Sequence, residues 1–170
     1  NLIITMELTR DLRICKLGKK SQRGYWFTED QVRKFLDSTT WARRKADKTA
    51  FVSVTHRSRR KPNDPLDTKA VGPRDYMLVD KTTVGAIIDS WIEDGYWMCK
   101  ILIFDPDKFE GKAKEEISYA HGLLASGVKL RSSAGVEAYY NEITKHADVI
   151  YDLVGCDFTN NPDFEEGGIV

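Results

Sequence analysis

Residues 84–93, VGAIIDSWIE, lead through Asp94-Gly95 into residues 96–104, YWMCKILIF, and this stretch decides the fold. Both runs alternate in apolar character, which is typical of strands. Glycine tolerates the positive φ that a two-residue type I′ turn requires. One face of the second run carries Trp97, Cys99, Ile101 and Ile103, which predicts that this face is turned toward the core. The stretch therefore predicts an antiparallel hairpin that ends before Asp105-Pro106.

Weaker signals on both sides of the hairpin predict two helices and further strands. Thr28 and Gln31 form a capping box that opens the first helix. The second helix is expected over 111–125, with Gly127 as its stop. The predicted fold is mainly β with flanking helices (α+β), built as a small β-barrel or a curled sheet. Further strands are expected over 2–16, 50–56, 128–133, 136–140 and 149–159.

The length of 170 residues fits one domain with a substantial core, so we expect a single domain over 1–170. Residues 57–82 form a long polar segment with three prolines. Loops of this length inside a domain are unusual and are often functional or mobile. We therefore expect a long loop here, as a candidate activation or inhibitory segment.

The charges balance, with 26 Lys+Arg against 26 Asp+Glu, and this gives no global attraction to nucleic acid or membrane. Basic residues do cluster at 43–45 and 57–61, and such runs are most often solvated loops. A nucleic-acid-binding module that uses these clusters stays an alternative, and it predicts strongly salt-dependent DNA binding. No apolar run reaches membrane-spanning length. We expect no membrane partner and no specific nucleic acid.

The thiols and imidazoles show no metal-binding pattern. Cys15, Cys99 and Cys156 are far apart and odd in number, which favours buried, reduced thiols in a cytosol-like compartment. The three histidines are equally scattered, and no phosphate-binding glycine loop is present. We expect no metal and no cofactor.

Ser132-Ser133-Ala134-Gly135 is a candidate nucleophile segment at a predicted strand end. Alternation places Ser132 on the side of Val128 and Leu130, and Ser133 on the other, polar side. If the apolar side faces the core, Ser133 is the serine that a substrate can reach. The backbone N–H groups near Ala134 and Gly135 could hold an oxyanion.

A serine nucleophile needs a base, and the base is commonly oriented by an acid. His56 ends a strand, a place that holds a side chain while leaving it accessible. His121 lies on the apolar face of a predicted helix, and His146 lies in a polar turn, so both suit structural or surface roles better. The acidic candidates near strands are Asp89, Asp152 and Asp157.

Five segments resemble a known family in the same order. They are residues 21–28, before the first helix; 51–56, a strand ending in His56; 87–96, within the hairpin; 126–133, which lead to Ser133; and 153–157, which end in Asp157. Together they resemble the prohead proteases of large tailed bacteriophages, which are related in fold to the herpesvirus assemblin proteases. The resemblance implies a small β-barrel flanked by helices.

The resemblance also implies a function and a site. Ser133 would be the nucleophile, His56 its base and Asp157 the third catalytic group of a serine endopeptidase. The implied substrates are capsid and scaffold proteins and the enzyme itself, which could also form an oligomer. The implied location is the immature prohead in the host cytoplasm.

Two departures from the family pattern bear on the oxyanion hole. Ala134 stands where members commonly have Arg, and Arg57 stands where a Pro often follows the catalytic His. The oxyanion details therefore stay open, and Arg131 could contribute. A catalytically inactive capsid or scaffold component on the same fold is the main alternative.

Overall fold

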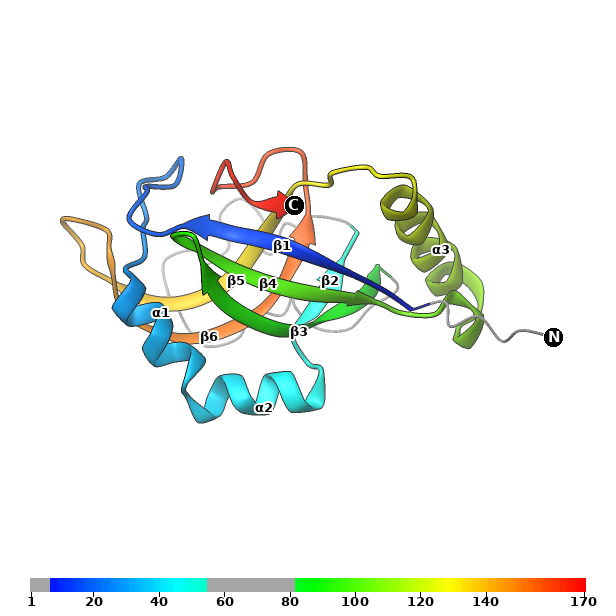
Figure 1. Ribbon diagram of the computed structural model, residues 1–170, viewed down its shortest axis with the longest axis horizontal. Helices are drawn as coiled ribbons and strands as arrows, with labels where there is room; N and C mark the ends of the chain where they lie inside the picture. Colours follow the sequence, from blue (N-terminus) through cyan, green and yellow to red (C-terminus); the bar gives the residue numbers. More distant parts are fainter. Residues whose placement is uncertain (1–6, 55–81) are drawn as a thin grey trace, which may run out of the picture.

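The computed structural model describes residues 7–54 and 82–170, and its strands form one curled, seven-stranded sheet (Figure 1). The strand order is β5-β6-β2-β3-β4-β1-β7. The predicted fold, mainly β with flanking helices, is confirmed. The strands are β1 (Leu8–Lys16), β2 (Phe51–Ser53), β3 (Thr83–Glu93), β4 (Tyr96–Ile103), β5 (Ser132–Tyr140), β6 (Ala147–Phe158) and β7 (Gly168–Ile169).

The β3–β4 hairpin forms as its sequence predicts. Asp94 and Gly95 have φ values of 52° and 79°, the left-handed pair that a type I′ turn needs. The predicted core face of β4 is also confirmed, since its four apolar residues are each 0% exposed. This hairpin lies in the middle of the sheet, and β1 and β2 pair with its two outer edges.

In the described ranges, three α-helices and one 3-10 turn flank the sheet. They are α1 (Glu29–Leu36), α2 (Thr39–Asp47), η3 (Pro106–Lys108) and α3 (Gly111–Ala125). The cap of α1 is confirmed, because Thr28 Oγ1 accepts a hydrogen bond from Gln31 N at 3.4 Å. The bounds of α3 are those predicted, and Gly127 follows its end with a φ of 84°.

The expectation of only two helices is wrong, because α2 was not predicted. Ser38 caps it by accepting a hydrogen bond from Trp41 N at 3.2 Å. Trp41 is the one buried residue in this helix, so the sequence lacks the apolar stripe that normally reveals one. Both α1 and α2 pack against β6 and β3, whereas α3 packs against β3, β4 and η3.

The two strands expected over 128–133 and 136–140 are one strand, β5, which begins only at Ser132. Val128 lies outside it and is 40% exposed, because the chain is still crossing from α3 to the sheet. Shifts of register, the first between Gly135 and Val136, let β5 continue without a break.

The two edges of the sheet meet at Gly168. β7 pairs with β1 through Arg13 and Gly168, and an isolated bridge joins Gly168 to Arg131, just before β5. A Cβ atom on Gly168 would lie 2.8 Å from Leu130 O, so only glycine fits this approach. The sheet therefore curls into a barrel that closes where the two edges meet.

The hydrophobic core, which is shared by the sheet and the three helices, includes all three cysteines. Cys15, Cys99 and Cys156 are buried free thiols, as predicted. Burial raises the pKa of each thiol well above its ordinary value. Within 7–54 and 82–170, no helix is long and apolar enough to span a bilayer.

Candidate active site

Three neighbouring strands place polar residues in one row. In the antiparallel pair of β5 and β6, Ser133 lies opposite Asp157. In the parallel pair of β2 and β6, Ser53 lies beside the same Asp157. Residues that face each other across paired strands project from the same face of a sheet. Ser133, Asp157 and Ser53 therefore form a row across the three strands, with Asp157 in the middle.

The two adjacent serines differ in accessibility as strand alternation predicts. Ser132 is 2% exposed, and its Oγ is buried without a hydrogen-bond partner among the residues that the structure describes. Ser133 is partly exposed. The pairing with β6 is regular from Ser132 to Gly135, so the alternation holds at both serines. The prediction that Val128 shares a strand face with Ser132 is wrong, because Val128 lies outside the strand.

The structure separates the three acidic candidates. Asp157 is 1% exposed and lies opposite Ser133. Asp89 is exposed and lies 3.8 Å from Lys45 Nζ. Asp152 accepts two hydrogen bonds from Arg44, at 2.8 Å from Nε and 2.7 Å from Nη2. Asp89 and Asp152 are thus paired with cations of α2, and Asp157 is the candidate that shares a row with Ser133.

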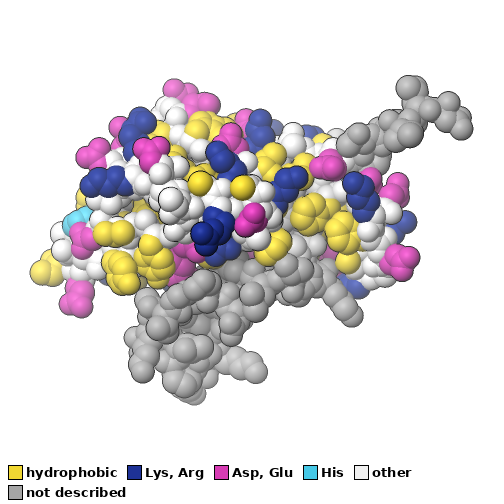
Figure 2. All heavy atoms as spheres, turned by 90° about the horizontal axis from the view of Figure 1, so that it is seen from below, with side chains coloured by type: hydrophobic (Ala, Val, Ile, Leu, Met, Phe, Trp, Pro, Cys, Tyr) yellow, Lys and Arg dark blue, Asp and Glu magenta, His cyan; other side chains and the backbone are white. Residues whose placement is uncertain are grey.

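The ion pair of Arg44 with Asp152 also shows what the first basic cluster, residues 43–45, does in the fold. The hydrogen bond to Asp152 is the main cause that raises the pKa of the Arg44 guanidinium. The centre of the 43–45 cluster therefore joins α2 to β6. On the face seen in Figure 2, Lys and Arg side chains are interspersed with Asp and Glu, and no single-sign patch of described residues stands out. A phosphate backbone would find little concentrated positive charge there.

His56 and the predicted loop over 57–82, with its second basic cluster, lie outside the described residues except for Thr82. The described chain stops at Val54 and resumes at Thr82, and these two positions are adjacent. Val54 N donates to Thr82 O at 3.1 Å. The hydroxyl groups of Ser53 and Thr82 are 2.8 Å apart. The chain therefore leaves and re-enters at the β2 end of the polar row.

The other two histidines lie in different parts of the fold. His121 is partly buried on α3, and its Nε2 is buried without a partner within the described ranges. His146 Nε2 lies 2.8 Å from Asp148 Oδ1, and its Nδ1 contacts Thr144 Oγ1. His146 precedes β6, whereas Asp157 is near the other end of this strand, so a rise of about 3.3 Å per residue over eleven residues separates them by roughly 36 Å along the strand.

The three oxyanion candidates have different positions. Ala134 and Gly135 follow Ser133 on β5 and lie opposite Cys156 and Gly155. Arg131 precedes the strand, and its guanidinium donates to two backbone carbonyls, Asn160 O at 3.1 Å and Glu165 O at 2.8 Å. The guanidinium of Arg131 thus already has two acceptors.

The row places a partly exposed hydroxyl beside a buried carboxyl, which are two of the three residue types of a Ser-His-Asp site. Ser53 was not singled out from the sequence. The alternation of Phe51, Ser53 and Thr55 on one face of the predicted strand was the available signal. No group of three metal-ligating side chains occurs in the part of the chain that the structure describes.

No family model matches the sequence, and no curated protein matches it. Among solved structures, the chain is similar to the capsid assembly protease of bacteriophage T4. The TM-score is 0.45 and the identity 10%, over 89% of this chain and 82% of that chain.

Proposed function

We propose that this chain is a serine endopeptidase in which Ser133 is the nucleophile, His56 the general base and Asp157 the group that orients the base. The observation that carries the proposal is the register of β5 and β6, which sets Ser133 opposite a buried Asp157. This pairing brings together two residues that lie 24 positions apart in the sequence.

Chain geometry supports His56 as the partner. Neighbouring strands lie about 4.8 Å apart, so Ser53 and Ser133, on strands two apart, are about 10 Å from each other. His56 follows Ser53 by three residues, and three residues span at most about 11 Å. The length of the chain therefore allows His56 to serve as the base of Ser133, and this role is part of the proposal.

The proposed chemistry is acyl transfer. His56 takes the proton from Ser133 Oγ as this oxygen bonds to the peptide carbonyl carbon. The C–N bond then breaks, and the same proton goes to the leaving amine. Water next gives a proton to His56 and attacks the acyl carbon, and Ser133 leaves with that proton. Asp157 favours the charged imidazole in both halves.

Oxyanion stabilisation belongs to backbone N–H groups near Ala134 and Gly135, next to the nucleophile on β5. The Arg131 side chain is not included, since it already serves two carbonyl oxygens. The proposed substrates are capsid and scaffold proteins, and the chain itself, within an immature viral prohead. That part of the proposal rests on the resemblance of the five sequence segments.

Hydrolysis of an unfolded protein tests the enzyme class. Purified chain is incubated with reduced, alkylated casein, and new amino termini are counted by mass spectrometry. We expect cleavage by the unaltered chain and by Ser132→Ala, and none by Ser133→Ala. Cleavage that survives in Ser133→Ala but is lost in Ser132→Ala overturns the assignment of the nucleophile. A folded, unaltered chain that cleaves neither casein nor a co-expressed scaffold protein favours the inactive capsid component.

A further inference from the structure

Arg131 lies two residues before Ser133 and joins the start of β5 to the segment that follows β6. Its Nη1 donates to Asn160 O at 3.1 Å and its Nη2 donates to Glu165 O at 2.8 Å. The planar guanidinium can hold two acceptors at once in a fixed geometry. One side chain therefore spans both ends of the turn formed by residues 160–165.

The backbone around Arg131 is held on both sides. On the β6 side, Thr159 N donates to Arg131 O at 3.0 Å. On the other side, Ser132 N donates to Gly167 O at 3.2 Å, and Ile169 N donates to Leu130 O at 2.8 Å. The strand that carries Ser133 thus begins between two paired segments.

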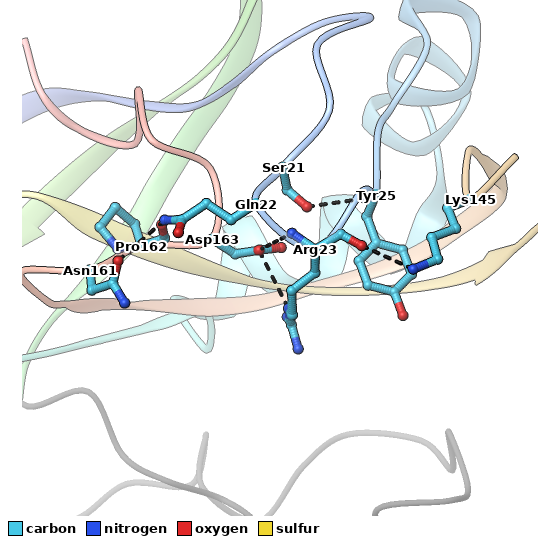
Figure 3. A network of polar contacts seen from close by, with 8 residues as sticks. All are labelled: Ser21, Gln22, Arg23, Tyr25, Lys145, Asn161, Pro162 and Asp163. Atoms are coloured by element: carbon cyan, nitrogen blue, oxygen red, sulfur yellow. Dashed lines mark hydrogen bonds and ion pairs between the residues drawn. The ribbon is translucent and has the colours of Figure 1, made fainter.

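The turn over 160–165 is also held from the loop that follows β1 (Figure 3). Gln22 Nε2 donates to Pro162 O at 2.8 Å, and Gln22 N donates to Asp163 O at 2.8 Å. Arg23 N donates to Asp163 Oδ1 at 3.0 Å. Within the described parts of the chain, Arg131 is the side chain that connects this turn to the start of β5 through two donated hydrogen bonds.

We propose that Arg131 is a positioning residue for the Ser133–Asp157 pair. The turn begins three residues after Asp157, and Arg131 lies two residues before Ser133. By holding the turn, the Arg131 side chain fixes the position of Ser133 relative to Asp157. The inference deepens the proposed function and rests on it. It also replaces the sequence-based idea that the Arg131 side chain contributes to the oxyanion hole.

A misplacement of about 1 Å can lower a rate by up to about 100-fold, so loss of the hydrogen bonds from Arg131 should affect the chemical step. The test measures acylation of the full chain by a fluorophosphonate at a series of concentrations, which separates the maximal rate from the half-saturating concentration. For Arg131→Ala we expect the maximal rate to fall by about 10-fold or more, with a half-saturating concentration changed by less than about two-fold.

Arg10→Ala is the matched control, because Arg10 also donates to two backbone carbonyls, Thr9 O and Leu124 O, but away from the polar row. Both variants are assayed at a temperature where circular dichroism shows them to be fully folded. A purely structural role for Arg131 predicts an unchanged maximal rate under these conditions, and that result overturns the inference.

Arg131→Lys keeps the charge but offers only a compact ammonium group in place of the planar fork. We expect it to fold and to recover only part of the maximal rate. Full recovery overturns the inference, because a charge alone then suffices. If Arg131→Ala does not fold, the lysine variant decides alone. Failure of the proposed function looks different, since the unaltered chain and Arg10→Ala would then also remain unlabelled.

Discussion

Ser133 on β5 and Asp157 on β6 lie directly opposite each other, at a point where the two strands pair without a shift of register. Their side chains therefore project from the same face of the sheet. The next strand, β2, sets Ser53 beside Asp157, and the chain leaves the described region one residue later. The polar row thus follows from the pairing of three strands, and two of its members, Ser133 and Asp157, belong to the proposed catalytic group.

Closure of the barrel at Gly168 is expected to be sensitive to a single methyl group. Gly168 has a φ of 149°, and a Cβ atom there would lie 2.9 Å from Arg131 Cα. Backbone strain and overlap each cost about 1–3 kcal/mol, so Gly168→Ala should lower the free energy of unfolding by about 3 kcal/mol. Urea denaturation measures this change.

Gly122 provides the control for that substitution. It lies inside α3, and a Cβ atom there meets nothing within 4 Å. Gly122→Ala should raise the free energy of unfolding by about 0.5–1 kcal/mol, since alanine is the better helix former. Equal effects of the two substitutions would contradict the role of Gly168 in closure.

The ion pair of Arg44 and Asp152 should contribute strongly to the attachment of α2. The two side chains are only 21% and 10% exposed. Arg44→Ala leaves a nearly buried carboxylate without its cation, and we expect a loss of about 3 kcal/mol in unfolding free energy. The neighbouring Arg43 is exposed, and Arg43→Ala should change stability by less than about 0.5 kcal/mol.

A double-mutant cycle checks that this loss comes from the pair. Arg44→Ala combined with Asp152→Ala should cost at least about 1 kcal/mol less than the sum of the two single variants. Strict additivity would show that the pair contributes no coupling energy.

Stability should fall at alkaline pH because of the buried thiols. Burial raises the pKa of Cys15, Cys99 and Cys156 above the ordinary value of 9.0. Above about pH 9, the unfolded chain loses these protons and the folded chain keeps them. The stabilisation is therefore complete below pH 9 and is lost as the pH rises, by about 1.4 kcal/mol per unit for each thiol.

The measurement is the unfolding free energy between pH 8 and pH 11, under reducing conditions. Cys99→Ala should flatten the alkaline slope by about 1.4 kcal/mol per unit, whatever its effect at neutral pH. If the unfolding free energy of Cys99→Ala changes with pH as steeply as that of the unaltered chain, Cys99 does not cause the alkaline loss of stability.

The sequence predicts those elements whose signals are local. The β3–β4 hairpin follows from Asp94-Gly95 between alternating runs, and α3 from its apolar face and Gly127. By contrast, α2 depends on partners outside the helix. Trp41 packs against Phe35 with ring centroids 5.9 Å apart, and Arg44 binds Asp152. These contacts stabilise α2 without an apolar stripe in its own sequence, so periodicity does not predict the helix. β7 has only two residues, which is too few for any periodicity.

For the candidate site too, local signals are predictable from the sequence and contacts between separate elements are not. Alternation alone selects Ser133 over Ser132, because both lie in one regular stretch of strand. Choosing Asp157 over Asp89 and Asp152 from the residues requires the pairing register of β5 and β6, which periodicity does not contain. The sequence also does not predict the hydrogen-bond acceptors of Arg131, because they belong to a turn more than 25 residues away along the chain.

Covalent labelling of the full chain tests the central claim most directly. The protein is reacted with diisopropyl fluorophosphate, the intact mass is measured, and tandem mass spectrometry locates the adduct in the peptide that contains Ser132 and Ser133. We predict one adduct per chain, on Ser133, formed equally by Ser132→Ala and absent from Ser133→Ala. An adduct on Ser132, or a folded chain that takes up no reagent, would contradict the account.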